Sequence, residues 1–183
     1  VSEDVLVIID ETYIDFVQNP EYKPAAAYAI SRPNVVVSRT FSKVYGLPGV
    51  RMGYALGHPE NFEDFWLYAG WMLPTLSVYA AAAALNDTEH IRKSKEAIWA
   101  GRTYLTLQLT AMGIPFTPSE SNFMVLDMGK DREDIINFMG KKKVLVRNAH
   151  EMWNIKNHFR VSIGTQDELE VFVDTLKEAL AKV

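Results

Sequence analysis

The chain has 183 residues and no cysteine, and its formal net charge is −4. The missing cysteine excludes disulfides, thiolate metal sites and a cysteine nucleophile, and it is consistent with a reducing compartment such as the cytoplasm. The negative net charge argues against a nucleic-acid partner, and no apolar run approaches the roughly 20 residues that a membrane span requires.

The chain begins VSEDVLVIID, without an initiator methionine or a signal-peptide pattern, and enters a strand almost at once. A processed domain would begin in this way, and so would a fragment of a longer chain. The continuous apolar run at 5–9 predicts a strand covered on both faces, a shorter run at 35–37 predicts a second strand, and the segment 50–56 predicts a third. The alanine-rich segment 25–30 predicts a helix between the first two strands. Together they form the strand–helix–strand pattern of a mostly parallel α/β sheet.

The segments that follow predict helices. Pro59 is suited to the first turn of a helix that runs to about residue 68, and a second helical stretch covers 75–86. From 88 to 112 apolar residues recur every seven positions, which predicts one long helix that ends before Gly113.

Beyond residue 114 the pattern is that of a smaller α+β unit. Its predicted elements are a loop and strand within 116–128, a helix over 131–140, strands at 143–147 and 158–164, and a final helix with a Thr165–Glu168 capping box. The sequence therefore predicts a first domain over 1–100 and a small C-terminal domain over 101–183, linked by the helix 88–112.

Asp10 closes the first apolar strand, and Tyr13 follows three residues later. In open α/β sheets ligands bind at the carboxyl ends of the strands, which is where the Asp10 carboxylate is expected. Each residue also has an ordinary structural interpretation, because an aspartate often starts a turn and a tyrosine often packs in a core.

The segment SRTFSKVYGLPGVRMGY, residues 38–54, brings two hydroxyls, a lysine and an arginine together. Thr40 and Ser42 occupy alternate positions, so in extended backbone their hydroxyls point the same way. Arg51 follows after a loop that contains glycine and proline, and a rigid loop can return its guanidinium to the hydroxyls. Two hydroxyls and a guanidinium are suited to a phosphate dianion.

A phosphate site beside Lys43 is the combination that pyridoxal phosphate requires, because its aldehyde forms a Schiff base with a lysine amine. The two clusters then have complementary roles. Asp10 would keep the pyridine nitrogen protonated, and Tyr13 would donate a hydrogen bond to the 3-oxygen of the ring. The order strand-D-x-x-Y followed by strand-T-x-S-K-x₇-R therefore predicts a single pyridoxal phosphate site.

The chain resembles the fold-type I aminotransferases, and within them the histidinol-phosphate aminotransferase-like group. Four segments carry the resemblance: IIDETYIDF (8–16), SRTFSKVYGLPGVRMGY (38–54), SNFMVLDM (121–128) and FRVSIGT (159–165). The resemblance covers the whole chain but only about the second half of a family chain. It implies an α/β fold, made of part of the large cofactor-binding domain followed by the small α+β domain. The cofactor contacts that it implies are Asp10, Tyr13, Lys43, Ser42, Arg51 and Thr40.

The resemblance also implies three substrate contacts in the C-terminal part. Arg160 interrupts an apolar strand and matches the position that grips the substrate α-carboxylate, whereas the ordinary alternative is an edge-strand arginine that reaches to water. Arg147 matches a position that helps to bind the distal anion in histidinol-phosphate enzymes. Asn122 lies on the small-domain strand near the site.

The implied reaction is transamination between an amino acid, or histidinol phosphate, and a 2-oxo acid, in a cytoplasmic homodimer. The family's first half supplies further cofactor contacts and is not found here, so we expect this chain alone to be inactive. Two alternatives stay open. A decarboxylase acting on an amino-acid phosphate would share the same residues, and a transcriptional regulator would carry a helix-turn-helix upstream of an aminotransferase-like sensor domain.

Overall fold

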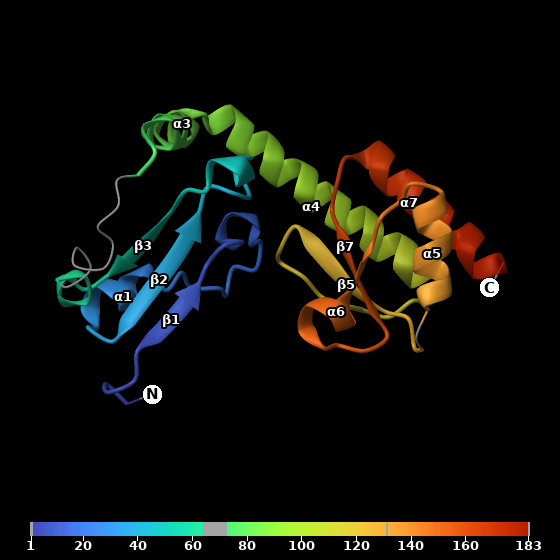
Figure 1. Cartoon of the computed structure of the whole chain (residues 1–183), viewed down its shortest axis with the longest axis horizontal. Coiled ribbons are helices and arrows are strands. Elements are labelled where there is room, and N and C mark those ends of the chain that lie inside the picture. The colour runs from blue at the N-terminus through green and yellow to red at the C-terminus, as the bar shows by residue number, and fades with distance from the viewer. Residues whose placement is uncertain (1, 64–72, 131, 183) are drawn as a thin grey trace. The chain divides into compact units, whose positions relative to one another are not determined.

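The computed structural model describes residues 2–63, 73–130 and 132–182 (Figure 1). The chain divides into two compact units, Val1–Ser94 and Lys95–Val183, and the division falls inside helix α4 (Thr88–Ala111). We call them the N-terminal unit and the C-terminal unit and describe each by itself. Of the described helices, none is long and apolar enough to cross a membrane.

The N-terminal unit is built on a three-stranded sheet in the order β1-β2-β3 (Figure 1). Strand β1 (Val7–Asp10) runs parallel to β2 (Val35–Thr40), which in turn pairs antiparallel with β3 (Gly53–Gly57). The expectation of a mostly parallel sheet is therefore wrong for this unit, whose sheet is mixed. The physical reason is the connection after β2, which contains no crossover helix and returns the chain alongside the strand it has just left.

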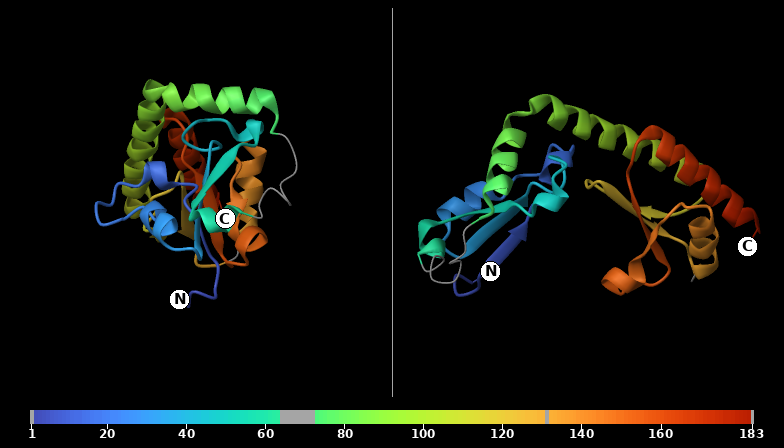
Figure 2. Two further views of the ribbon diagram at one scale, coloured as in Figure 1. Left: turned by 90° about the vertical axis from the view of Figure 1, so that its left-hand side faces the viewer. Right: turned by 45° about the horizontal axis from the view of Figure 1, so that its top comes forward.

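One face of this sheet is covered by α1 (Ala26–Ser31), whose bounds differ by one residue from the predicted helix at 25–30 (Figure 2). Ala29 and Val37 are fully buried between helix and sheet, and Val7 and Ile9 pack against them. Ile8 points the other way and is 67% exposed. The prediction of a strand covered on both faces is thus met on one face only, because no described element covers the other.

The connection from β2 to β3 has its own small core. Phe41, Met52 and Ala81 are buried together, the last on helix α3 (Thr75–Asn86), which was predicted with these bounds. The Ser77 hydroxyl of α3 donates to the Val50 carbonyl at 2.9 Å. Gly46 adopts a φ of +68°, which an L side chain rarely tolerates. The connection, which includes the short helix η2 (Pro48–Val50), is therefore held as a defined loop.

The described part of the N-terminal unit also contains two further 3₁₀ helices. Helix η1 (Ile14–Phe16) follows β1 and buries Phe16. Helix η3 (Pro59–Phe62) begins at the predicted proline. The remainder of the helix predicted to residue 68 lies, from residue 64, outside the described residues.

The C-terminal unit is built on a four-stranded antiparallel sheet in the order β4-β5-β7-β6 (Figure 1). The strands are β4 (Phe116–Thr117), β5 (Phe123–Asp127), β6 (Arg147–Asn148) and β7 (His158–Ser162). One face packs on α4, α5 (Glu133–Lys141) and α7 (Gln166–Lys182). The fully buried side chains of this core are Leu105, Leu109, Leu126, Ile135, Met139, Leu176 and Ala179.

The ends of the long helices follow the sequence signals. Gly113, with a φ of +67°, ends α4 where it was predicted to end, and Ile114 N–H donates to the Leu109 carbonyl across the helix terminus. At the start of α7 the Thr165 backbone N–H donates to Glu168, and the Glu168 N–H reaches back to the Thr165 hydroxyl. This reciprocal pair confirms the predicted capping box.

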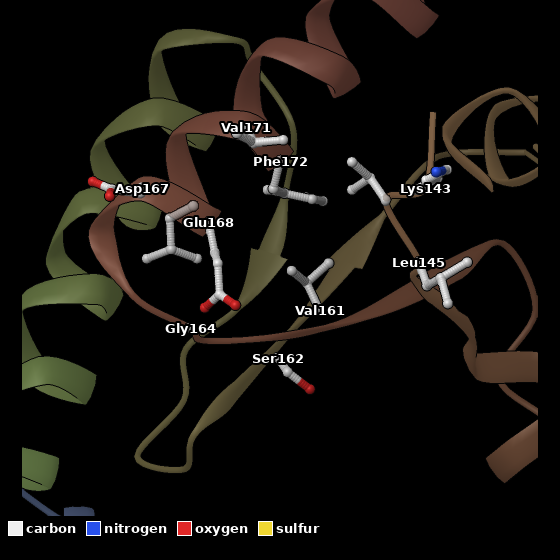
Figure 3. Close-up of a pocket in the computed structure, with 11 residues that line it drawn as sticks. Lys143, Leu145, Val161, Ser162, Gly164, Asp167, Glu168, Val171 and Phe172 are labelled. Atoms are coloured by element: carbon white, nitrogen blue, oxygen red, sulfur yellow. The ribbon is translucent and has the colours of Figure 1, made fainter. Parts of the chain in front are cut away.

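The strand predicted over 143–147 is wrong for most of its length, because β6 contains only Arg147 and Asn148. Lys143 has a φ of +63°, and Val144 N–H donates to the Met139 carbonyl, so this segment terminates α5 instead of pairing with β7. A pocket of about 470 Å³ separates the segment from β7 and the first turns of α7. Figure 3 shows this pocket, with Leu145 and Phe172 on either side of Val161.

Helix α6 (Ala149–Trp153) was not predicted. Its signal is the N-cap, because the Asn148 side-chain oxygen accepts from the His150 N–H at 3.0 Å. Trp153 at its end contacts Phe123 of β5, with ring centroids 5.8 Å apart. Phe123 alternates with the buried Met124, so α6 reaches the sheet face opposite the core.

Candidate active site

Asp10 lies at the carboxyl end of β1, as predicted, and is paired in register with Ser38 of the parallel strand β2. Its Oδ1 accepts hydrogen bonds from the Thr12 backbone N–H and hydroxyl, so the carboxylate also starts the turn after the strand. Its Oδ2 makes no hydrogen bond to the described part of the chain. Asp10 is exposed, and this second oxygen is therefore available to a ligand at the edge of the sheet.

Lys43 and Tyr13 meet at the same edge. The Lys43 Nζ lies 5.4 Å from the centroid of the Tyr13 ring, close enough for a cation–π contact. Tyr13 precedes η1, and Lys43 follows β2 after two residues, so the contact joins the ends of two neighbouring parallel strands. Both side chains are half-buried. The tertiary structure thus places the predicted lysine and phenol side by side.

The three residues predicted to bind the phosphate, Thr40, Ser42 and Arg51, are brought together only in part. The Thr40 hydroxyl accepts from the Ser42 backbone N–H at 3.0 Å and donates to the Met52 carbonyl at 3.4 Å, so both hydroxyl-bearing residues adjoin the chain beside Arg51. Arg51 itself is exposed, has a left-handed φ of 55°, and donates from Nη1 to the Pro48 carbonyl at 3.0 Å. The Arg51 backbone lies beside Met52, which the Thr40 hydroxyl contacts, whereas the Arg51 guanidinium makes no hydrogen bond to the hydroxyl of Thr40 or Ser42.

Sequence reasoning missed a buried ion pair beneath this edge. Glu11 follows Asp10, is 3% exposed, and accepts from Arg39 Nε at 2.9 Å and Nη2 at 2.7 Å. Its other oxygen accepts from the Ala25 N–H at 2.7 Å and the Tyr22 hydroxyl at 3.2 Å. We call these four residues the Glu11 network. The sequence did contain a signal for this pair. Glu11 follows Asp10 and Arg39 precedes Thr40, so each charged residue adjoins a predicted site residue at the end of an apolar strand.

The Glu11 network positions the site from the covered side of the sheet. Arg39 precedes Thr40, and Glu11 follows Asp10, so one bidentate pair ties the ends of β1 and β2 together. Burial by itself raises the pKa of Glu11, but the hydrogen bond from Ala25 and those from Arg39 and Tyr22 outweigh it and hold the pKa below its ordinary value. Glu11 is therefore ionised at neutral pH.

In the C-terminal unit, Arg160 lies on β7, an interior strand between β5 and β6. The alternative of an edge-strand arginine is therefore wrong. Its guanidinium carbon lies 4.3 Å from the centroid of the Phe123 ring, which holds the guanidinium against the sheet. Its Nε is buried and makes no hydrogen bond to any described residue. A buried donor without an acceptor is costly, and an anion would relieve it.

Arg147 is paired directly with Arg160 across β6 and β7. Directly opposed residues project from the same face of a sheet, with Cβ atoms roughly 5 Å apart, and like charges in this position repel. The face of the C-terminal unit that carries Phe123 thus carries an arginine on each of two neighbouring strands. Such a pair is suited to a ligand with two anionic groups.

Asn122 lies at the start of β5, where its carbonyl accepts from the Ile163 N–H at 2.9 Å. The segment before it is anchored to α4, because buried Arg102 donates to the Ser119 carbonyl at 3.1 Å. The Asn122 side-chain oxygen is buried without a hydrogen bond to any residue in the described ranges. Asn122 therefore shares with Arg160 an unused polar atom.

The chain is similar to known proteins over almost all of its length. The sequence pattern of the aminotransferase class I and II family matches residues 1–176. The histidinol-phosphate aminotransferase of Moorella thermoacetica is 37% identical over 183 residues, which cover 99% of this chain and 47% of the relative. Histidinol-phosphate aminotransferase 1 of Nitrosococcus oceani is 33% identical over 180 residues, which cover 97% and 48%.

A solved structure gives the same result. Histidinol-phosphate aminotransferase from Sinorhizobium meliloti, solved in complex with pyridoxal-5'-phosphate, superposes with a TM-score of 0.85 at 26% identity. The superposition covers all of this chain and 50% of that one. The chain thus spans about half the length of the relatives it matches. Over the part that it contains, the chain belongs to the aminotransferase class I and II family.

Proposed function

We propose that this chain is the C-terminal half of a pyridoxal phosphate-dependent aminotransferase that acts on an amino acid or histidinol phosphate and a 2-oxo acid. The observation that carries the proposal is the meeting of Lys43 with Tyr13 at the sheet edge where Asp10 ends β1. An amine, a phenol and a carboxylate at one sheet edge are what the cofactor requires, and the relatives' shared name supports this interpretation.

The residues of the N-terminal unit fit the cofactor. The unused oxygen of Asp10 would accept from the ring nitrogen, and the Tyr13 hydroxyl would donate to the 3-oxygen. Thr40 and Ser42 would hold the phosphate together with Arg51, whose guanidinium would have to leave the Pro48 carbonyl. That carbonyl is a neutral acceptor and phosphate a charged one, so the exchange is favourable.

The residues of the C-terminal unit fit an anionic substrate. Arg160 would bind the α-carboxylate, with Asn122 beside it as a second polar contact. Arg147 would bind a distal anion such as the phosphate of histidinol phosphate. The support lies in the paired arginines on one sheet face and in the buried Nε of Arg160, which has no protein acceptor in the described residues.

Lys43 would carry the proton in the reaction. When bound, pyridoxal phosphate supplies an aldehyde that captures amines and a protonated ring that withdraws electrons from the α-carbon. The Lys43 amine would take the α-proton and return it, as a general base and then a general acid. The Asp10 carboxylate would keep the ring nitrogen protonated, and the Glu11 network would hold the ends of β1 and β2 at fixed separation.

The finer features of this proposal concern the whole protein. The N-terminal unit would be part of a large cofactor-binding domain over 1–100, and 101–183 would form the small domain. The full-length protein would be a homodimer in the cytoplasm. This chain alone would bind the cofactor weakly and lack turnover, because it holds only part of the cofactor site.

A donor-panel assay tests the proposal. The full-length protein, incubated with pyridoxal phosphate, 2-oxoglutarate and each of histidinol phosphate, aromatic and small amino acids, should form glutamate from at least one donor. Release of carbon dioxide from an amino-acid phosphate without glutamate formation would instead identify the decarboxylase. No reaction with any donor, together with an upstream DNA-binding segment, would favour the regulator. The 183-residue chain, assayed in parallel, should be inactive.

Replacing Arg160 with methionine should raise KM for the amino donor by about tenfold or more, because a charged hydrogen-bonded pair is lost. Arg147→Met should raise KM for histidinol phosphate and leave that for a donor without a distal anion nearly unchanged. Steady-state kinetics of the full-length variants measure both effects. Arg92→Met, which removes an exposed arginine of α4, is the matched control. Equal KM increases in all three variants would contradict the assignment.

A further inference from the structure

Arg132 has the same unusual property as the residues proposed to bind substrate. Among the described residues, three buried side-chain polar atoms make no hydrogen bond: Asn122 Oδ1, Arg160 Nε and Arg132 Nη2. Buried polar groups without partners are rare in folded proteins, and each calls for a ligand or another explanation. Neither the family resemblance nor the proposed reaction gives Arg132 a role.

Arg132 is held at the N-terminus of α5, where it is the N-cap residue. Its side chain is 12% exposed, and only Nε is used, in a 3.2 Å ion pair with Asp134. The guanidinium therefore keeps most of its five donors unused within the described part of the chain. A fixed, largely desolvated guanidinium with free donors is a strong site for an oxyanion.

Arg132 borders a cavity of about 250 Å³ in the C-terminal unit. The cavity is open to solvent on one side and lies between the α5 N-cap, the start of α6 and the start of β7. Its lining residues are Arg132, Asn148, His150, Lys156, Asn157, His158 and Phe159. The lining holds two permanent cations and two histidines and, among the described residues, no carboxylate. Asp134 neutralises part of the Arg132 charge from outside the lining.

The cavity is preformed. His158 Nδ1 donates to the Lys156 carbonyl at 2.6 Å, which fixes the imidazole orientation. The Asn157 carbonyl accepts from the Met128 N–H at 2.8 Å, and Asn148 is tied to the first turn of α6. The volume corresponds to about eight water molecules, so it exceeds an inorganic anion and is below a drug-sized ligand.

We propose that this cavity binds a small organic dianion, a phosphomonoester or a short dicarboxylate, with Arg132 and Lys156 as its charged contacts. None of Arg147, Arg160 and Asn122 lines it. The site is thus a second anion site in the C-terminal unit, and it does not depend on the proposed transamination. Its ligand would be held by the positive charges of Arg132 and Lys156, both of which line the cavity.

Calorimetric titration of the purified 183-residue chain with glycerol phosphate and with succinate tests the site. At least one probe should bind saturably in the millimolar range or tighter. Arg132→Met should weaken binding about tenfold or more, since one charged contact is lost. Lys156→Met should weaken it as well and keeps the test valid if the Arg132 variant fails to fold, because Lys156 is exposed.

Two controls separate this site from others. Arg160→Met should retain the binding, which distinguishes the cavity from the proposed substrate site. Arg92→Met removes the same charge from an exposed position and should also retain it. Absence of saturable binding for both probes would overturn the proposal, and so would equal weakening in the Arg132 and Arg92 variants or loss of binding in Arg160→Met.

Discussion

Replacing Lys43 with alanine in the full-length protein is expected to lower turnover by about 10⁴-fold and to remove the visible absorbance that arises when the cofactor aldehyde condenses with a lysine amine. The physical reason is that one side chain both attaches the cofactor and moves the α-proton.

The measurement is an absorbance spectrum together with single-turnover kinetics of the loaded enzyme. Lys23→Ala removes an exposed lysine of the same unit and should change neither readout. Addition of methylamine should restore part of the Lys43→Ala activity, since a free amine can replace the missing base. Survival of both absorbance and turnover in Lys43→Ala would show that another lysine holds the cofactor.

Replacing Glu11 with alanine is expected to lower the free energy of unfolding by roughly 3–5 kcal/mol, because it leaves the Arg39 guanidinium without its bidentate partner in a largely buried place. The Ala25 N–H at the start of α1 and the Tyr22 hydroxyl lose their acceptor as well. Urea denaturation of the protein at neutral pH measures the loss. Hydrogen exchange of peptides that span 11–40 should show it locally.

The stabilisation by Glu11 should depend on pH in a defined direction. The pKa of Glu11 is held below its ordinary value of 4.5, so the ionised form is favoured in the folded state. The contribution is fully present above pH 4.5 and is lost as the pH falls through the lower folded-state pKa. Glu11→Gln should lack this part of the acid dependence. Glu89→Ala, which removes an exposed carboxylate paired with Arg92 and Lys93, should have little effect. If Glu11→Gln and Glu89→Ala show the same dependence of unfolding on pH, the Glu11 carboxylate does not stabilise the fold in this way.

Much of the local structure could be predicted because it depends on near neighbours in the chain. The helix over 75–86, the end of α4 at Gly113 and the Thr165–Glu168 capping box each follow from a few adjacent residues. The prediction of a strand over 143–147 was wrong, although the contacts that decide this segment are also local. Its apolar residues satisfy strand periodicity, but the backbone at Lys143 and Val144 is used to terminate α5.

The candidate site likewise has features that the sequence predicted and features that it did not reveal. The order of Asp10, Tyr13, Thr40, Ser42, Lys43 and Arg51 along the chain was enough to suggest one cofactor, because each residue type matches one group of that molecule. The sequence did not reveal that Glu11 and Arg39 join the two strand ends from the covered face. Nor did it reveal that Arg160 lies on an interior strand opposite Arg147, since strand order is settled only when the sheet assembles.

By itself the sequence determined the helices with clear end signals, the parallel pairing of β1 and β2 around a short helix, and the residue types of a cofactor site. These are consequences of periodicity, capping and chemical type, which act over a few residues. Tertiary structure alone decided the mixed sheet, the Glu11 network, the adjacent arginines of β6 and β7 and the cavity beside Arg132. Each of these depends on which segments distant in the chain share a surface, and that is set by the burial of apolar side chains throughout each unit.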